Sequence, residues 1–175
     1  YPAATGIGTQ HGGILVDFNA VKGGIEIIPL DNDWQKAAHV YSDEVLISHR
    51  TDAEKGTPKF ERGKSLSDHQ CEMIYISGTA AIRGEESIVT GDVLVQTEIT
   101  LENIQHLIGL EEGREKLPEH SGKLELLRVY LKHEEDAKIV KEDMDKLCPD
   151  VPIVYLYADV CREELLVEIE GIAYL

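Results

Sequence analysis

Residues 151–173 read VPIVYLYADVCREELLVEIEGIA, and this stretch decides the fold. Its two halves, residues 153–160 and 165–173, are rich in β-branched and aromatic side chains, the composition typical of strands. Residues 161–164 between them are few enough to form a turn. The pattern therefore predicts a hairpin of two antiparallel strands at this end of the sequence.

The second of these strands carries two carboxylates on one face. Because alternate strand residues point the same way, Leu165, Val167 and Ile169 should face one side, and Glu168 and Glu170 the other. Two strand residues span about 6.5 to 7 Å, so like-charge repulsion can raise one pKa where water is partly excluded. A carboxyl group that stays protonated near neutrality can act as a general acid. Without further information, a solvated face remains the simpler interpretation of both glutamates.

The sequence before this stretch alternates between strands and helices. Residues 123–131 and 71–77 have strand composition, and residues 87–90 add a weaker candidate. Apolar residues at three- and four-residue spacing predict one helix after Gly91-Asp92 and another from Ala137 to Leu147, which Pro149 and Pro152 end. The fold class is therefore α+β, a mixed sheet backed by two helices on one face.

The first part of the chain has a different organisation. Residues 14–18 and 25–28 predict an antiparallel pair of strands, and the apolar spacing from Trp34 to Val45 predicts a helix that ends near Ser48. Residues 49–68 are polar and lack a period, as in a long loop. The first hairpin resembles the last one, so we divide the chain into residues 1–50, the tail of a preceding unit with two strands and a helix, residues 51–70, a loop, and residues 71–175, a complete unit.

Composition excludes several classes of function. The 175 residues carry 17 Lys and Arg against 33 Asp and Glu, a net charge of −16, which disfavours binding to nucleic acid or to anionic membranes. No apolar run approaches the about 20 residues of a membrane helix. Three cysteines without metal-ligand spacing suit free thiols in a reducing compartment, so we expect a cytoplasmic protein. The seven histidines lack ligand spacing and no nucleotide motif occurs, so no metal and no cofactor are expected.

Several segments resemble the Rid/YjgF superfamily, also called endoribonuclease L-PSP. They are Tyr75-Ile76-Ser77-Gly78-Thr79-Ala80, Gly91-Asp92 with Gln96-Thr97, Leu101-Glu102-Asn103-Ile104, and Val167-Glu168-Ile169-Glu170-Gly171-Ile172-Ala173. Within that superfamily the chain is most similar to the chorismatases. The residues that carry this second resemblance are Pro2-Ala3-Ala4-Thr5-Gly6-Ile7, Asn32 with Gln35, Ala38 and Tyr41, Pro58-Lys59-Phe60-Glu61-Arg62, and Cys161-Arg162 with Leu165-Leu166-Val167-Glu168.

The resemblance implies a Rid/YjgF-like, chorismate-mutase-like unit and an enzyme that hydrolyses chorismate. Chorismatases are about twice this length, so the chain would correspond to their C-terminal half, with the N-terminal half missing. The family's active site lies in the cleft between the last two units. The alternatives are a Rid-type enamine or imine deaminase and a non-catalytic Rid-like protein. Deaminases carry an arginine on the strand after the proline equivalent to Pro152, where this chain has Ile153 and Val154.

The resemblance also assigns roles to particular residues. Glu168 matches the chorismatase acid, which would protonate the enolpyruvyl ether so that pyruvate leaves. A small-molecule dicarboxylate such as chorismate needs cations, and Arg62 and Arg162 are the candidates because arginine binds carboxylates through two parallel hydrogen bonds. Tyr41 could hydrogen-bond a carboxylate. Taken without the resemblance, both arginines would be interpreted as surface residues and Tyr41 as a core residue.

Three smaller residues complete the predicted site. Cys161 lies seven positions before Glu168 and is expected to shape the pocket or touch the substrate, since no neighbouring histidine could make it a nucleophile. Gly78 and Ala80, at the end of a strand, could present backbone amides to the substrate. Rid units assemble in threes, so we expect a homotrimer, or a pseudo-trimer completed by the missing half.

Overall fold

A computed structural model of the chain describes residues 1–9, 12–46, 55–69, 72–109 and 123–174. Six strands form one sheet in the order β1-β2-β3-β8-β6-β7, and β4 and β5 form a separate two-stranded ribbon. The strands are β1 Glu26–Leu30, β2 Gly63–Ser67, β3 Glu72–Thr79, β4 Ile82–Arg83, β5 Glu86–Ser87, β6 Lys123–Leu131, β7 Ile153–Tyr157 and β8 Val167–Tyr174. The helices are η1 Ala38–Val40, α1 Val93–Leu107, η2 Glu134–Asp136 and α2 Ala137–Leu147.

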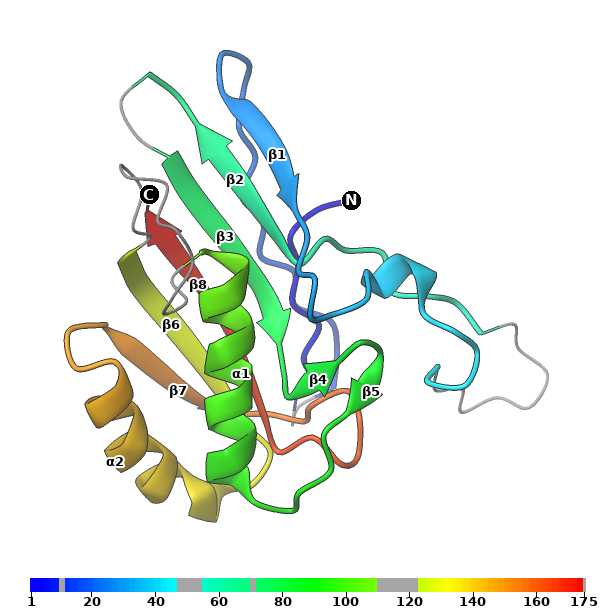
Figure 1. The fold of residues 1–175 in the computed structure, drawn as a ribbon, viewed down its shortest axis with the longest axis vertical. Coiled ribbons are helices and arrows are strands. Elements are labelled where there is room, and N and C mark those ends of the chain that lie inside the picture. The colour runs from blue at the N-terminus through cyan, green and yellow to red at the C-terminus, as the bar shows by residue number, and fades with distance from the viewer. Residues whose placement is uncertain (10–11, 47–54, 70–71, 110–122, 175) are drawn as a thin grey trace.

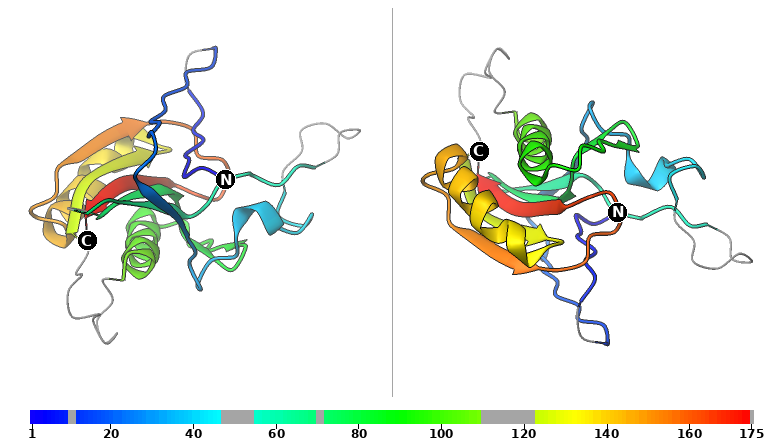
Figure 2. Two further views of the ribbon diagram at one scale, coloured as in Figure 1. Left: turned by 90° about the horizontal axis from the view of Figure 1, so that it is seen from above. Right: turned by 90° about the horizontal axis from the view of Figure 1, so that it is seen from below.

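Both long helices cover the same face of the sheet (Figures 1 and 2). They pack on the strands through one apolar core, to which α1 contributes Leu101 and Ile104 and α2 contributes Val140 and Met144. Among the described residues, no helix lies on the opposite face of the sheet. The α+β class, with a mixed sheet backed by two helices, is therefore confirmed.

The sequence locates the central elements of this unit well. The predicted strand 123–131 and the predicted helix 137–147 coincide with β6 and α2, and the strand predicted over 71–77 is β3, which runs two residues further, to Thr79. Helix α1 begins where expected because the Asp92 side chain accepts hydrogen bonds from the backbone N–H groups of Leu94 and Val95. Of the strand predicted over residues 87–90, only Ser87 belongs to a strand. That strand, β5, pairs with β4 outside the main sheet.

The predicted hairpin of residues 153–173 is wrong. β7 and β8 are not neighbours, because β6 lies between them, parallel to β7 and antiparallel to β8. Helix α2 carries the chain back to the starting end of β6, so β7 must run parallel to β6. Residues 158–166 then cross the end of the sheet, where Ala158 and Lys132 anchor the crossover by backbone hydrogen bonds to Leu131 and Leu166.

The predictions for residues 14–48 are also wrong in part. Residues 14–18 form no strand, and Ile14 is 94% exposed, since β1 pairs with β2 instead. β2 lies inside the predicted loop, which therefore is partly a strand. The predicted helix is reduced to η1, because the backbone of Gln35 and Lys36 bonds to Asn32 and Gly84 rather than to the next helical turn. Ser48 and the start of the loop lie outside the described residues.

β1 joins the same sheet as β3 to β8, with β2 between them. The division of the chain into a preceding tail and a complete unit stays a prediction. Among the described residues, we find no helix with the length and apolar character needed to span a membrane.

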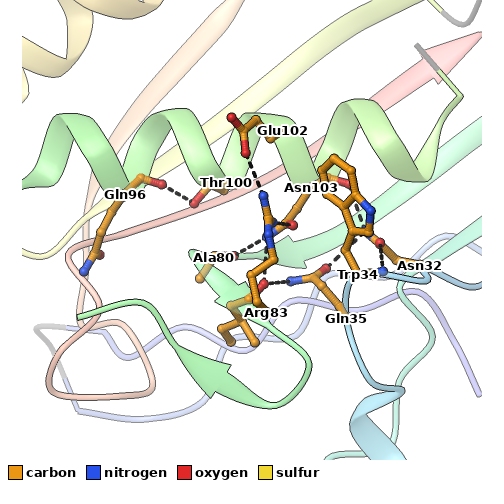
Figure 3. A network of polar contacts seen from close by, with 10 residues as sticks. Asn32, Trp34, Gln35, Ala80, Arg83, Gln96, Thr100, Glu102 and Asn103 are labelled. Atoms are coloured by element: carbon orange, nitrogen blue, oxygen red, sulfur yellow. Dashed lines mark hydrogen bonds and ion pairs between the residues drawn. The ribbon is translucent and has the colours of Figure 1, made fainter. Parts of the chain in front are cut away.

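A network of buried amides attaches the first part of the chain to α1 (Figure 3). Asn32 donates from Nδ2 to the backbone carbonyl of Asn103 at 2.9 Å, and Asn103 donates from its own Nδ2 to the carbonyls of Ala80 and Ile82 at 3.0 and 3.1 Å. Arg83 bonds to Oδ1 of Asn103 and pairs with Glu102 at 2.6 Å. Because Asn103 is fully buried, its amide has no water to replace these partners.

We expect Asn103→Ala to lower the free energy of unfolding by about 1 to 3 kcal/mol, because carbonyl groups lose their donor inside the protein. Glu102→Ala is the matched control on the same helix: it removes a half-exposed ion pair, worth about 0 to 1 kcal/mol. Urea unfolding followed by circular dichroism measures both. Equal losses for the two variants would contradict the structural role of Asn103.

Candidate active site

Glu168 is a buried carboxyl group on the face of the sheet that lacks helices. On β8, Val167 and Ile169 point into the core beneath the helices, so the alternation directs Glu168 to the other side, as predicted. The residue is nevertheless only 6% exposed. Something other than the helices must therefore exclude water from it.

Gly78 and the N-terminal segment, residues 1–8, cover the Glu168 carboxyl group. A Cβ atom added at Gly78 would lie 2.1 Å from Oε1 of Glu168 and 2.8 Å from the Thr5 methyl group. The Gly78 N–H donates to the Thr5 hydroxyl at 2.8 Å, and the backbone of Gly8 pairs with that of Asp159. The close approach of Glu168 to β3 is possible because position 78 has no side chain.

The two glutamates of β8 differ in ionisation. Burial, followed by the negative charge of Glu170, raises the pKa of Glu168 to about 7. Burial also acts on Glu170, but hydrogen bonds from Thr5, Arg128 and Tyr130 outweigh it and lower the pKa of that carboxyl group. Near neutrality, Glu168 is thus partly protonated, whereas Glu170 is a carboxylate.

Tyr41, Arg62 and Arg162 form a second buried cluster. The Nη2 atom of Arg62 donates hydrogen bonds to the Tyr41 hydroxyl and to the Lys36 carbonyl. The guanidinium carbon of Arg62 lies 5.6 Å from the centre of the Tyr41 ring. Arg162 lies 5.4 Å from the same ring centre and donates to the Ser87 hydroxyl at 2.9 Å. The structure therefore brings together three of the predicted substrate-binding residues from distant parts of the chain.

Neither arginine forms an ion pair with a carboxylate among the described residues. Both are more than nine-tenths buried, and Nε of Arg62 has no hydrogen-bond partner there. Buried cations without a counter-ion are unfavourable, so the cluster is suited to binding an anion. The interpretation of these arginines as ordinary surface residues does not fit their burial.

Cys161 connects the two clusters along the crossover of residues 158–166. It precedes Arg162 directly, and its side chain is exposed to solvent. Partial desolvation and the negative charge of Glu168 raise the pKa of the thiol, so it is a poor nucleophile at neutral pH. The supporting contribution of Cys161 to the site therefore stays a prediction.

Ala80 contributes less to the site than Gly78. Its carbonyl group accepts hydrogen bonds from Asn103 and from the backbone of Ile82, so that oxygen already has its partners (Figure 3). A hollow of about 270 Å³ includes Arg162 among its lining residues but does not include Glu168. The hollow thus reaches only one end of the predicted site.

Sequence reasoning gave no role to three residues around Glu170: Thr5, Arg128 and Tyr130. Thr5 was visible only as part of the Pro2-to-Ile7 pattern, and the other two as alternate residues of strand 123–131. Their positions depend on β6 pairing with β8, which the predicted hairpin did not contain. Among the described residues, no three His, Cys, Asp or Glu side chains are grouped so that they could hold a metal ion.

Comparison with solved structures defines the fold first. The chain resembles YyfA of Yersinia pestis, a member of the Rid protein family, with a TM-score of 0.51 and 17% identity over 73% of this chain and 96% of that one. It resembles the crystal structure of a chorismatase more closely, with a TM-score of 0.73 and 29% identity over 98% of this chain and 50% of that one. The fold is that of the Rid/YjgF proteins.

Within this fold, the similarity is to the chorismatases, as the sequence indicated. The chain is 35% identical over 179 residues to a chorismatase of Streptomyces rapamycinicus, and 33% identical over 185 residues to a 3-hydroxybenzoate synthase of Streptomyces hygroscopicus. Each alignment covers 98% of this chain and 50% of the relative. The chain thus spans about half the length of the curated relatives it matches. No family model matches it.

Gly78→Ala should destabilise the protein by about 1 to 3 kcal/mol, because its methyl group must displace the buried Glu168 carboxyl group. Gly6→Ala is the matched control, since a Cβ there meets nothing within 4 Å. Urea unfolding of both variants gives the comparison. If Gly78→Ala were as stable as Gly6→Ala, the close approach of Glu168 to β3 would be wrong.

The raised pKa of Glu168 also predicts how stability depends on pH. Below pH about 4.5 the Glu168 carboxyl group is protonated in both the folded and the unfolded chain, so its burial does not reduce the free energy of unfolding through ionisation. As pH rises to about 7, the unfolded chain loses this proton first, and the wild type should lose roughly 3 kcal/mol relative to Glu168→Gln. Denaturant titrations at several pH values measure this difference, and a difference independent of pH would contradict it.

Proposed function

We propose that this chain carries the catalytic acid and the anion-binding residues of a chorismatase-like enzyme. The enzyme would hydrolyse the enolpyruvyl ether of chorismate to pyruvate and a cyclic hydroxy acid. The observation that carries the proposal is the buried Glu168, whose pKa of about 7 keeps much of it protonated at neutral pH. Curated relatives named chorismatase and 3-hydroxybenzoate synthase support the choice of substrate.

The chemistry needs one proton at a carbon atom. Glu168 donates its proton to the methylene carbon of the enolpyruvyl group, which becomes a methyl group and leaves an oxocarbenium ion at the ether carbon. Water adds to that carbon and gives up a proton to the Glu168 carboxylate, which restores the acid. The resulting hemiketal breaks at the ether bond and releases pyruvate and the ring alcohol. An acid with a pKa near the working pH suits both proton transfers.

The arginine cluster supplies charge for the substrate. Chorismate carries two carboxylates, and the net charge of −16 would repel it unless local cations compensate. Arg62 and Arg162 are buried around Tyr41 without a carboxylate partner among the described residues, and the free Nε of Arg62 offers a further donor. Cys161 is next to Arg162 in the chain and Gly78 packs against Glu168, so both would lie beside the bound substrate.

Imine deamination is a weaker explanation of the site. Rid deaminases would need an arginine where β7 begins with Ile153 and Val154. A reducing, cytoplasmic setting and assembly of Rid-like units in threes belong to the same proposal. The free Cys148 and Cys161 support the first, and the exposed edge strand β1 supports the second.

Glu168→Gln and Arg62→Ala should impair the enzyme in different ways. The first removes the proton donor, and kcat should fall by about 10² to 10⁴ with binding retained. The second removes charge-assisted hydrogen bonds, so chorismate should bind about ten- to hundredfold more weakly. In the wild type, the rate should fall as pH rises through about 7.

The assay is pyruvate release from chorismate by the protein expressed from its complete open reading frame, with chorismate affinity measured by calorimetry. Circular dichroism checks that each variant is folded. Equal turnover by the wild type and Glu168→Gln would rule out the assigned acid. Absence of turnover in the wild type would overturn the proposed function, and an imine substrate would then be tested.

A further inference from the structure

Glu170 is held by three hydrogen-bond donors from two different parts of the chain. Arg128 Nη1 and the Tyr130 hydroxyl each lie 2.7 Å from its Oε1, and Thr5 of the N-terminal segment donates a third hydrogen bond. Arg128 is half-exposed, but the Glu170 side chain it pairs with is only 15% exposed. One carboxylate therefore receives a cation and two hydroxyl groups where water has limited access.

The register of the sheet creates this arrangement. Arg128 lies directly across from Glu170 on β6, whereas Tyr130 lies directly across from Glu168. Tyr130 nevertheless turns its hydroxyl group to the diagonal neighbour, Glu170. Glu168 thus loses the donor that its strand partner could have provided, and Glu170 gains it.

Among the described residues, charged and titratable groups lie near Glu168 on three parts of the chain. On β8 there is Glu170, on β6 there are Tyr130 and Arg128, and on the crossover there is Cys161. Thr5 and Gly78, which close the other sides, carry no charge. Arg128 forms an ion pair with Glu170 and also interacts electrostatically with Asp17.

We infer that Glu170 is a positioning residue for the general acid: held ionised by Arg128, Tyr130 and Thr5, it places a fixed negative charge beside Glu168 that keeps the Glu168 proton in place. The catalytic meaning of this inference rests on the proposed function. Its physical part concerns only the protonation of Glu168 and can be measured without a substrate.

The distance supports a strong effect. Two residues on one strand face are separated by about 6.5 to 7 Å. At this separation, and at the effective dielectric constant of protein interiors, one unit charge shifts the pKa of the other group by roughly one unit or more. The negative charge of Glu170 acts in the same direction as the burial of Glu168, and together they raise the pKa of Glu168 to about 7. The Thr5 hydroxyl group also accepts a hydrogen bond from the N–H of Gly78, against which the Glu168 carboxyl group packs. The same hydroxyl group therefore contacts both Glu170 and the strand residue beside Glu168.

Two substitutions in the Arg128–Glu170 pair separate this role from ordinary structural support. Glu170→Gln removes the negative charge and leaves Arg128 unpaired, so the pKa of Glu168 should fall by about one unit. Arg128→Gln removes the positive charge but leaves Glu170 ionised through Tyr130 and Thr5, so the pKa of Glu168 should rise. If the substitutions acted only by loss of packing, the pKa of Glu168 would shift in the same direction in both variants, toward the value of a solvated glutamate.

The measurement is the titration of the Glu168 carboxyl carbon by nuclear magnetic resonance in protein labelled at glutamate, with Glu168→Gln to assign the signal. Asp145→Asn, which breaks an exposed ion pair with Lys141 on α2, is the matched control and should leave the titration unchanged. Shifts of opposite sign in Glu170→Gln and Arg128→Gln would establish the inference. No shift in Glu170→Gln, or shifts of the same sign in both variants, would overturn it.

The pH dependence of pyruvate release provides the second readout. The loss of rate at high pH should move to lower pH in Glu170→Gln and to higher pH in Arg128→Gln, by the same amounts as the carboxyl titration. Opposite titration shifts without pyruvate release in any variant would leave the control of Glu168 protonation established and would overturn the proposed function alone. An altered titration with an unmoved pH profile would overturn Glu170 as a positioning residue of the reaction.

Discussion

The site depends on the burial of one carboxyl group, Glu168, with which no cation of the described residues forms an ion pair. Strand β8 must direct Val167 and Ile169 into the core beneath α1 and α2, and the alternation then places Glu168 on the face without helices. Gly78 and the N-terminal segment exclude water from that position. Desolvation without a compensating positive charge favours the protonated form, so the packing of the sheet itself produces an acid.

The charges of the site are separated in space. Arg128 forms an ion pair with Glu170. Arg62 and Arg162 lie in a different cluster around Tyr41 and form no ion pair with a carboxylate among the described residues. If either of these two arginines paired with Glu168, the glutamate would be ionised and the arginine would no longer be available to a substrate. The arrangement therefore allows a partly protonated carboxyl group and two buried arginines to coexist in a strongly acidic protein.

Local pattern was sufficient for the elements with a clear period. The spacing of apolar residues located α2, and the alternation of β8 correctly separated Glu168 from its core neighbours. It failed for residues 34–46, where the helical spacing is real but the backbone of Gln35 and Lys36 finds partners at Asn32 and Gly84. It also failed for residues 14–18, because a strand composition produces a strand only where another strand offers its edge.

The sequence by itself determined the class of fold, the resemblance to the chorismatases, and the residues that alternate on β8. Only the tertiary structure decided that β6, rather than β7, lies beside β8, and this pairing brings Arg128 and Tyr130 to Glu170. It also decided that Thr5 meets Gly78 across a separation of 73 residues. The physical reason is that alternation and helical period depend on neighbours along the chain, whereas strand order and the desolvation of Glu168 depend on segments that meet only when the whole sheet has formed.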